Sequence, residues 1–182
     1  MTPIFLITGA PAVGKTTTGR ALASRFAKSL HIPVDDVRRM VVSGVRHPGS
    51  AWDAGLIEQL SAARESVSVM AMRYHPLGFT VVIDDFYDPH SKMAEYDALL
   101  AHPQTHRILL YPHKAAALER NLKRSGATEF SHYIADGIHA VYGYLETAID
   151  ELRDQGWIII DSTTQSVEQT VDKILEHTGA KA

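Results

Sequence analysis

The chain has 182 residues, which is enough for one domain with a substantial hydrophobic core and too few for two comfortable ones. Its 45% hydrophobic and 21% charged residues are typical of a globular protein, and the lack of cysteine excludes disulfides, thiolate zinc sites and a cysteine nucleophile. A net charge of −3 argues against nucleic acid as a partner, and no apolar run reaches the roughly 18 residues of a membrane span. The start of the chain lacks a basic segment, so we expect a cytoplasmic protein without a signal peptide, with residues 1–182 forming a single domain.

Short apolar runs alternate with helical stretches along the whole chain. The runs are nearly continuous in apolar residues, as in strands buried on both faces of a parallel sheet, and cover Ile4–Thr8, Leu30–Val34, Phe79–Asp84, Arg107–Tyr111 and Trp157–Asp161. Apolar residues at steps of three and four predict a helix over Ala54–Arg73 that closes at Leu77-Gly78. Asp88-Pro89 resembles a helix start, and Ser166 with Gln169 has the spacing of a capping box. The alternation predicts an α/β doubly wound domain.

The first predicted strand leads directly into a phosphate-binding loop. Gly9-Ala10-Pro11-Ala12-Val13-Gly14-Lys15-Thr16-Thr17 contains the complete pattern G-x-x-x-x-G-K-[ST] and precedes a predicted helix over Thr17–Phe26. Glycines let backbone N–H groups converge on phosphates, and the helix N-terminus attracts the same anion. We therefore expect residues 9–17 to bind a nucleoside triphosphate, with Lys15 on the β- and γ-phosphates and Thr16 as a magnesium ligand.

A phosphate-binding loop indicates a nucleotide but not a reaction. The N-K-x-D motif of GTPases is absent from the sequence. A chain of this length that begins with such a loop resembles the small P-loop kinases, the class of shikimate, gluconate and adenylate kinases. This resemblance implies a P-loop NTPase three-layer sandwich with a five-stranded parallel sheet, in the order 2-3-1-4-5, flanked by helices. It also implies ATP and Mg²⁺ as cofactors.

The segment after the second predicted strand narrows the resemblance. Asp35-Asp36-Val37-Arg38 resembles the acceptor-binding segment of a group that includes chloramphenicol phosphotransferase and the 5′-kinase domain of polynucleotide kinase. That pattern implies that Asp35 accepts the proton of the phosphorylated hydroxyl and that Arg38 holds a polar or anionic part of the acceptor. Residues three apart share a helix face, and ligands bind at this end of α/β sheets. Asp36 is the alternative base, and capping of the helix by either Asp is the alternative without a function.

More cationic and aromatic residues follow this segment. Arg38, Arg39, Arg46 and His47 lie within ten residues, which fits an acceptor that carries a phosphate or carboxylate. A solvated helix face is the simpler explanation for Arg39 and His47. Trp52 either stacks on the acceptor or serves as a packing anchor.

The third predicted strand ends in Asp84-Asp85, which is the pattern of a Walker B strand. A carboxylate at this place can hold magnesium, often through water, or orient the attacking hydroxyl. The resemblance assigns the metal to Asp84, together with Thr16, and makes Asp85 a contact of the acceptor. An ordinary turn after the strand is the alternative.

The fourth predicted strand precedes a helix that carries Arg120 and Arg124 on one face. In small P-loop kinases this place holds the lid, here a short one around residues 120–132, whose arginines would neutralise the transferred phosphoryl group. The choice between the two arginines is open, and a surface helix is the alternative. The His- and Tyr-rich stretch that follows has no metal-ligand spacing and is expected to be structural, with a place in the acceptor pocket as the alternative.

The sequence therefore predicts an ATP- and Mg²⁺-dependent phosphotransferase that moves the γ-phosphate to a hydroxyl of a small molecule such as an antibiotic, sugar or nucleoside. A small-molecule acceptor is the expected partner, with no membrane and no nucleic acid, and the protein is expected to be a monomer or homodimer. Two alternatives stay open: a regulatory ATPase module without an acceptor, and a polynucleotide 5′-hydroxyl kinase, which the negative charge disfavours.

Overall fold

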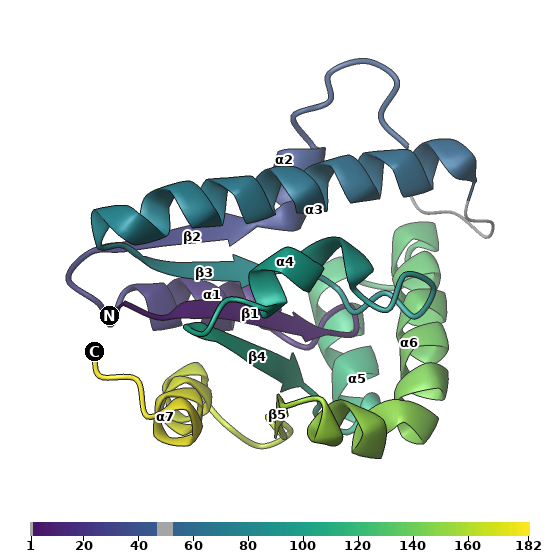
Figure 1. The fold of residues 1–182 in the computed structure, drawn as a ribbon. Helices are drawn as coiled ribbons and strands as arrows, with labels where there is room; N and C mark the ends of the chain where they lie inside the picture. The colour runs from purple at the N-terminus through teal and green to yellow at the C-terminus, as the bar shows by residue number, and fades with distance from the viewer. Residues whose placement is uncertain (1, 47–52) are drawn as a thin grey trace.

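The computed structural model describes residues 2–46 and 53–182 and has a five-stranded sheet at its centre (Figure 1). The strand order is β2-β3-β1-β4-β5 and every pairing is parallel. The strands are β1 (Ile4–Gly9), β2 (Ser29–Pro33), β3 (Thr80–Asp84), β4 (Thr105–Leu110) and β5 (Trp157–Ile160). The predicted α/β class and strand order are confirmed.

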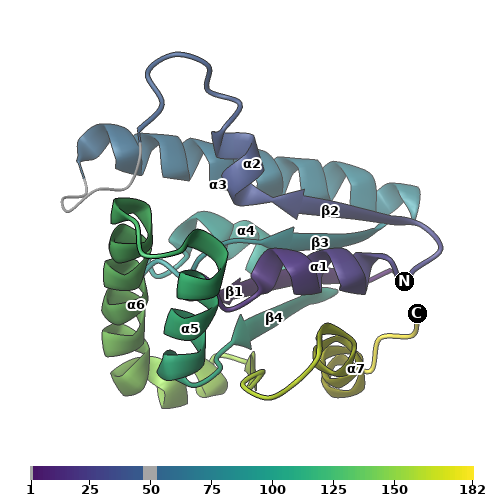
Figure 2. The same cartoon turned by 180° about the vertical axis from the view of Figure 1, so that it is seen from behind.

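Helices cover both faces of the sheet. They are α1 (Lys15–Ala23), α2 (Val34–Arg38), α3 (Ala54–Tyr74), α4 (Asp97–Leu100), α5 (Lys114–Ser125), α6 (Glu129–Asp154) and α7 (Val167–Thr178), with short 3-10 turns η1 (His75–Leu77) and η2 (Ala94–Tyr96). Figure 2 shows α1 in front of the sheet on the face that α7 shares, whereas Figure 1 shows α3 and α4 on the opposite face. No helix in the described part of the chain is long and apolar enough to cross a membrane.

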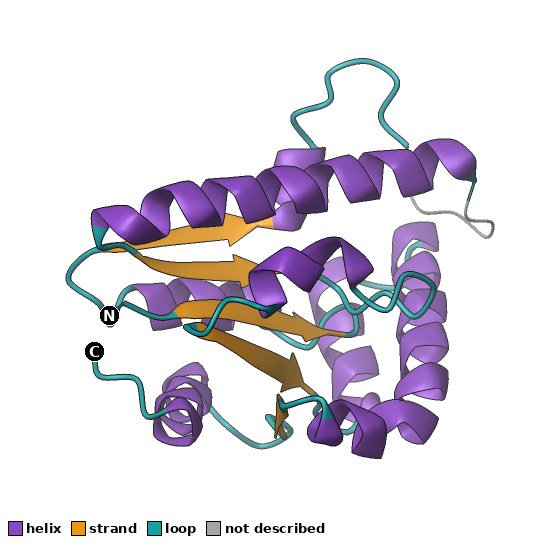
Figure 3. Ribbon diagram, in the orientation of Figure 1, coloured by secondary structure: helices purple, strands orange, loops and turns teal. Residues whose placement is uncertain are grey.

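The central strands explain why their sequences read as continuous apolar runs. Each residue of β1 and β3 is buried, because both strands have a neighbour on each side and helices above and below. The edge strand β2 is only partly buried. Figure 3 shows the arrows of β1, β3 and β4 pointing to the side of the molecule where α5 and α6 lie, and parallel pairing gives β2 and β5 the same direction. Ligands of open α/β sheets bind at the carboxyl edge of the sheet, which is where the predicted site residues lie in sequence.

The predicted bounds of the long helix hold to within one residue, whereas the helix after the P-loop covers Lys15–Ala23 and not the predicted Thr17–Phe26, and the helix start predicted at Asp88-Pro89 is wrong. Helix α3 starts after Asp53, whose carboxylate accepts a hydrogen bond from the backbone N–H of Leu56, and the capping box at Ser166 is present. No helix starts at Asp88-Pro89; the next helical residues are those of η2. The carboxylate of Asp88 accepts a hydrogen bond from the backbone N–H of His90 and another from a buried arginine, and these bonds hold a turn in place of a helix start.

Candidate functional site

The P-loop connects β1 to α1 in a tightly curled conformation. A β-carbon on Gly9 would lie 2.5 Å from the carbonyl oxygen of Leu110, so only glycine fits there. Ala12 and Gly14 both have left-handed backbones, with φ of 63° and 98°. Helix α1 begins at Lys15, immediately after the loop, so its free N–H groups open towards it. A curled loop in front of a helix N-terminus is a suitable cradle for phosphate.

Lys15 folds back over this loop and lies among several charged groups. Its Nζ donates a hydrogen bond of 2.9 Å to the carbonyl oxygen of Ala10. Desolvation by burial lowers the pKa of Lys15, whereas the carboxylates of Asp84, Asp35 and Asp85 raise it. These three acids come from β3, the start of α2 and the residue after β3. The fold therefore brings them within electrostatic reach of the P-loop lysine.

The two residues predicted as magnesium ligands are in direct contact. The Thr16 hydroxyl donates to Oδ1 of Asp84 over 2.7 Å. The other carboxylate oxygen, Oδ2, lies 2.7 Å from Nε2 of His31 on β2. Asp84 is 4% exposed, so this carboxylate is held inside the protein by one partner on each oxygen. Sequence reasoning did not identify His31, although a histidine inside an apolar strand is the kind of signal that points to such a contact.

The chemistry of these donors fits magnesium held together with a nucleotide. Within residues 2–46 and 53–182 there is no group of three or more His, Cys, Asp or Glu side chains that could hold a metal by itself. Magnesium is commonly bound through one or two protein oxygens, with phosphate oxygens and water completing the octahedron. One hydroxyl and one carboxylate beside a phosphate cradle form such a partial set.

The two acids at the start of α2 point to different surroundings. Asp35 accepts a hydrogen bond of 3.3 Å from Arg38, whose side chain is 10% exposed, whereas Asp36 accepts one of the same length from Arg39, whose side chain is 66% exposed. The cap residue of α2 is Pro33, and no side chain caps the helix, so capping by an aspartate is not what these acids do.

Arg38 connects this region to two neighbouring segments. Its Nη1 donates to the carbonyl oxygen of Arg46 over 2.9 Å, and its Nε is buried without a partner among the described residues. Burial raises the pKa of Tyr133 on α6, Arg38 lowers it and Asp35 raises it, so α6 borders the same region. His47 and Trp52, both considered as acceptor contacts, lie outside the described residues.

Asp85 lies in a buried network with Arg64 of α3. Its Oδ2 accepts hydrogen bonds from Nε of Arg64, at 2.7 Å, and from the hydroxyl of Tyr96, at 3.1 Å. The same guanidinium also pairs with Asp88 and Glu95, and the Arg64 side chain has no exposed surface. Burial raises the pKa of Asp85 to about 6, against the opposing effect of Arg64. This carboxylate is 2% exposed and committed to the network, so the contact with an acceptor predicted for it does not match its surroundings.

The sequence analysis did not identify Arg64 as part of a buried network, although its position in the helix pattern indicates one. It stands four residues after Leu60 and three before Val67, on the buried face of α3. A charged residue at an apolar position of a helix needs buried partners of opposite charge. The sequence does not say which acids supply them.

The two lid arginines have different partners. Arg120 donates to the carbonyl oxygen of Val13 in the P-loop, at 3.2 Å, and to those of Ser162 and Thr163 after β5. Arg124 is exposed, makes no hydrogen bond or ion pair with any described residue, and lies close enough to Lys15 to lower its pKa. The predicted lid comprises the end of α5, a short link, and the start of α6, where Thr128 and Ser131 form a capping box.

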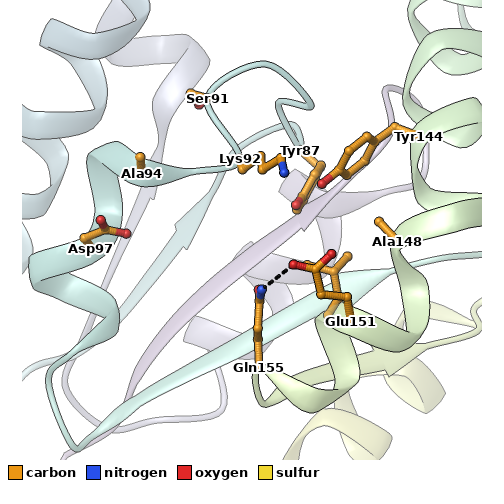
Figure 4. Close-up of a pocket in the computed structure, with 10 residues that line it drawn as sticks. Tyr87, Ser91, Lys92, Ala94, Asp97, Tyr144, Ala148, Glu151 and Gln155 are labelled. Atoms are coloured by element: carbon orange, nitrogen blue, oxygen red, sulfur yellow. Dashed lines mark hydrogen bonds between the residues drawn. The ribbon is translucent and has the colours of Figure 1, made fainter.

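The structure has a cavity of about 450 Å³ that none of the predicted site residues lines. It is bounded by the segment after β3 and the C-terminal half of α6. Figure 4 shows the rings of Tyr87 and Tyr144 on one wall, stacked at 5.8 Å, with Lys92 next to them. On the opposite side, Gln155 donates a hydrogen bond to Glu151.

Comparison with known proteins identifies relatives of the fold. A family model described as an AAA domain matches residues 4–142. No curated protein matches the sequence significantly. Among solved structures, shikimate kinase from Bacteroides thetaiotaomicron has a TM-score of 0.64 at 16% identity, with 98% of this chain and 99% of that chain covered. A gluconokinase from Sinorhizobium meliloti has a TM-score of 0.65 at 17% identity, covering 97% and 91%. The tunicamycin resistance protein of Deinococcus radiodurans has a TM-score of 0.63 at 20% identity, covering 100% and 98%.

Proposed function

We propose that this chain, which belongs to the AAA domain family and has the fold of the small P-loop kinases, is an ATP- and Mg²⁺-dependent phosphotransferase acting on a small-molecule hydroxyl. The observation that carries the proposal is the approach of Asp35, Asp84 and Asp85 to Lys15. Binding and hydrolysis of a nucleotide account for Lys15, Thr16 and Asp84. They do not account for Asp35, a half-exposed carboxylate at the same place.

In this proposal the P-loop binds the nucleotide. The N–H groups of the loop and of the first turn of α1 bind the phosphates, and Lys15 exchanges its bond to the Ala10 carbonyl for a phosphate oxygen. Thr16 and Asp84 would hold the metal. Magnesium, when bound, neutralises charge on the phosphate oxygens. Arg120, which joins the P-loop to the segment after β5, would fix the shape of the nucleotide site.

Asp35 is the proposed general base. A hydroxyl oxygen of the acceptor attacks the γ-phosphorus, its proton passes to Asp35, and the bond from the γ-phosphorus to the bridging oxygen breaks to leave ADP. Arg38 orients Asp35 through their hydrogen bond, and its buried Nε supports the proposed polar contact with the acceptor. Asp35 acts on the charge of Lys15 and pairs with the buried Arg38, whereas Asp36 pairs with the exposed Arg39, which supports Asp35 in the choice between the two acids.

Arg124 is the lid arginine favoured by these contacts. Its guanidinium has no competing hydrogen bond in the described structure, whereas that of Arg120 is occupied by three backbone carbonyls. An arginine that swings onto the phosphates stabilises charge that spreads over oxygens in the transition state.

The acceptor class is proposed from the fold relatives. Their names include kinases of shikimate and of gluconate, which are small hydroxylated carboxylates. An acceptor of this kind, with a hydroxyl for Asp35 and a polar or anionic group for Arg38, fits the charges at the start of α2. The negative net charge of the chain disfavours the polynucleotide 5′ end, because tracking a phosphate backbone needs a basic surface.

The test compares ADP release from ATP and Mg²⁺ with and without pooled acceptors. The pools are nucleosides, sugars and sugar acids, hydroxylated antibiotics, and short 5′-hydroxyl oligonucleotides. We expect one small-molecule pool to raise ADP release by the wild type, and Asp35→Asn to lose that increase by at least about 100-fold, since general bases contribute about 10²–10⁴-fold. Asp36→Asn is the matched control and should retain it.

Two results would reject this function. If no pool exceeds the rate without acceptor and Asp35→Asn equals the wild type, the regulatory ATPase module becomes the better explanation. If only the oligonucleotides raise ADP release, the enzyme is a polynucleotide 5′-hydroxyl kinase.

A further inference from the structure

His31 contacts the carboxylate that the proposed function assigns to magnesium, yet it belongs to no motif. It lies on β2, where its register partner on β3 is Val82, and Asp84 is two residues further along the same face of that strand. Its side chain is 14% exposed and extends along the sheet to place Nε2 2.7 Å from Oδ2 of Asp84. Because a carboxylate only accepts, the hydrogen of this bond is on Nε2.

Gly19 of α1 provides the space for this histidine. A β-carbon at position 19 would lie 2.8 Å from Nε2 of His31, which is closer than such atoms approach in real proteins. Gly19 is buried in the middle of the helix, where glycine costs roughly 0.5–1 kcal/mol relative to alanine. The helix therefore carries a destabilising residue at the one point where His31 needs room.

The two partners of Asp84 leave Thr16 ready for a cation. A hydroxyl has one hydrogen and two lone pairs, and Thr16 uses its hydrogen on Oδ1 of Asp84. Both lone pairs of Thr16 then remain available as metal donors. His31 satisfies Oδ2, so the plane of the carboxylate is fixed from both sides and Oδ1 stays directed at Thr16.

We infer that His31 is a positioning residue for the magnesium of the bound nucleotide, and that Gly19 is present in α1 to admit it. The inference rests on the proposed function only in that the nucleotide binds at the P-loop with its metal; it does not depend on the acceptor. Hydrogen-bond partners of metal-ligating side chains typically change metal affinity by about 10–100-fold when they are removed. We expect an effect of that size on magnesium and none on the nucleotide alone.

The experiment measures binding of a non-hydrolysable ATP analogue by calorimetry, over a range of Mg²⁺ concentrations and in EDTA, on the full chain. His31→Leu should weaken the apparent Mg²⁺ affinity by about 10–100-fold while leaving the affinity in EDTA unchanged. His31→Gln retains a side-chain N–H donor and should recover most of the Mg²⁺ affinity. The matched control is His106→Leu, a partly buried strand histidine that stacks on Phe5, away from the site, and should behave as the wild type.

Gly19→Ala tests the same inference without touching the histidine. Alanine favours the helix, and the close contact of its β-carbon is with the end of the His31 side chain and not with backbone, so the variant should still fold. Its β-carbon displaces the His31 ring, and the Mg²⁺ affinity should fall as it does in His31→Leu.

The inference is overturned if His31→Leu keeps the Mg²⁺ affinity of the wild type. It is also overturned if His31→Leu loses affinity equally in Mg²⁺ and in EDTA, because the histidine then has only a structural role. A wild type that binds no nucleotide in either buffer would overturn the proposed function, and the inference with it. A negative result in the acceptor assay would leave this inference standing, since the calorimetry measures nucleotide binding without an acceptor.

Discussion

Arg120 and Arg124 lie on one helix face, and only their contacts separate their roles. Arg120 holds the P-loop to the segment after β5 through backbone carbonyls, whereas Arg124 is solvent-exposed near Lys15. We expect Arg124→Ala to lower kcat by about tenfold or more with little change in the KM for ATP, because its contact forms as charge develops. Arg120→Ala should raise the KM for ATP as well, since the P-loop loses the hydrogen bonds that connect it to the segment after β5. Steady-state kinetics on both variants separates the two.

The opposite assignment has a clear signature. In the opposite case, Arg120→Ala lowers kcat without changing the KM for ATP, and Arg124→Ala changes neither constant. Arg120 would then be the arginine that acts on the transferred phosphoryl group. Lys123→Ala is the control, because this neighbour pairs with Glu119 on the solvent face of the same helix.

At the scale of elements, the sequence predicted what depends on local pattern and missed what depends on register. Buried parallel strands and the P-loop each have a signature within a few consecutive residues, and they were located correctly. The bonds from Arg64 to Asp85 and from His31 to Asp84 join elements far apart in sequence. They follow from strand register and from the face that α3 presents. The same network explains the error at Asp88, whose carboxylate bonds to Arg64.

The Arg64 network ties α3 to the segment after β3, and its loss should be costly. One buried cation faces Asp85, Asp88 and Glu95, so Arg64→Leu leaves buried carboxylates without their partner. Breaking a buried ion pair on one side costs about 3–5 kcal/mol, and we expect a loss of that order in urea unfolding at neutral pH. Arg25→Leu is the control, because its pair with Asp172 is at the surface and contributes at most about 1 kcal/mol.

The free energy of unfolding that Arg64→Leu loses relative to the wild type should be smaller in acid. The pKa of Asp85 is already raised from 3.8 to about 6 in the native protein, and removing the guanidinium raises it further. A carboxyl with a higher pKa in the folded state binds more protons there, so its contribution to stability falls as the pH rises through that range. The difference between variant and wild type should therefore be larger at pH 7 than at pH 5. An equal loss of unfolding free energy at pH 5 and pH 7 would contradict the explanation that unpaired buried carboxylates destabilise the variant.

At the scale of the whole molecule, four separate parts of the chain meet at the carboxyl edge of the sheet. The P-loop follows β1, Asp35 follows β2, Asp84 ends β3, and α5 brings the lid arginines from the other side. Since these parts come together only in the folded chain, a nucleotide bound among them stabilises the native state against unfolding. Stabilisation by a ligand depends on its concentration relative to its Kd.

Thermal unfolding with ATP analogue and Mg²⁺ tests this convergence for the whole chain. At about 100 times the Kd, binding adds about 2.7 kcal/mol, and this should raise the Tm of the wild type by roughly 5–10 °C. Lys15→Ala removes the cation that reaches the phosphates and should abolish most of the shift, while its Tm without ligand stays near that of the wild type. Lys123→Ala should keep the full shift, because Lys123 lies on the exposed face of α5. A full Tm shift in Lys15→Ala would mean that the nucleotide binds somewhere other than the P-loop. The roles assigned above to Thr16, Asp84 and Arg124 would then be wrong, because all three depend on a nucleotide at that loop.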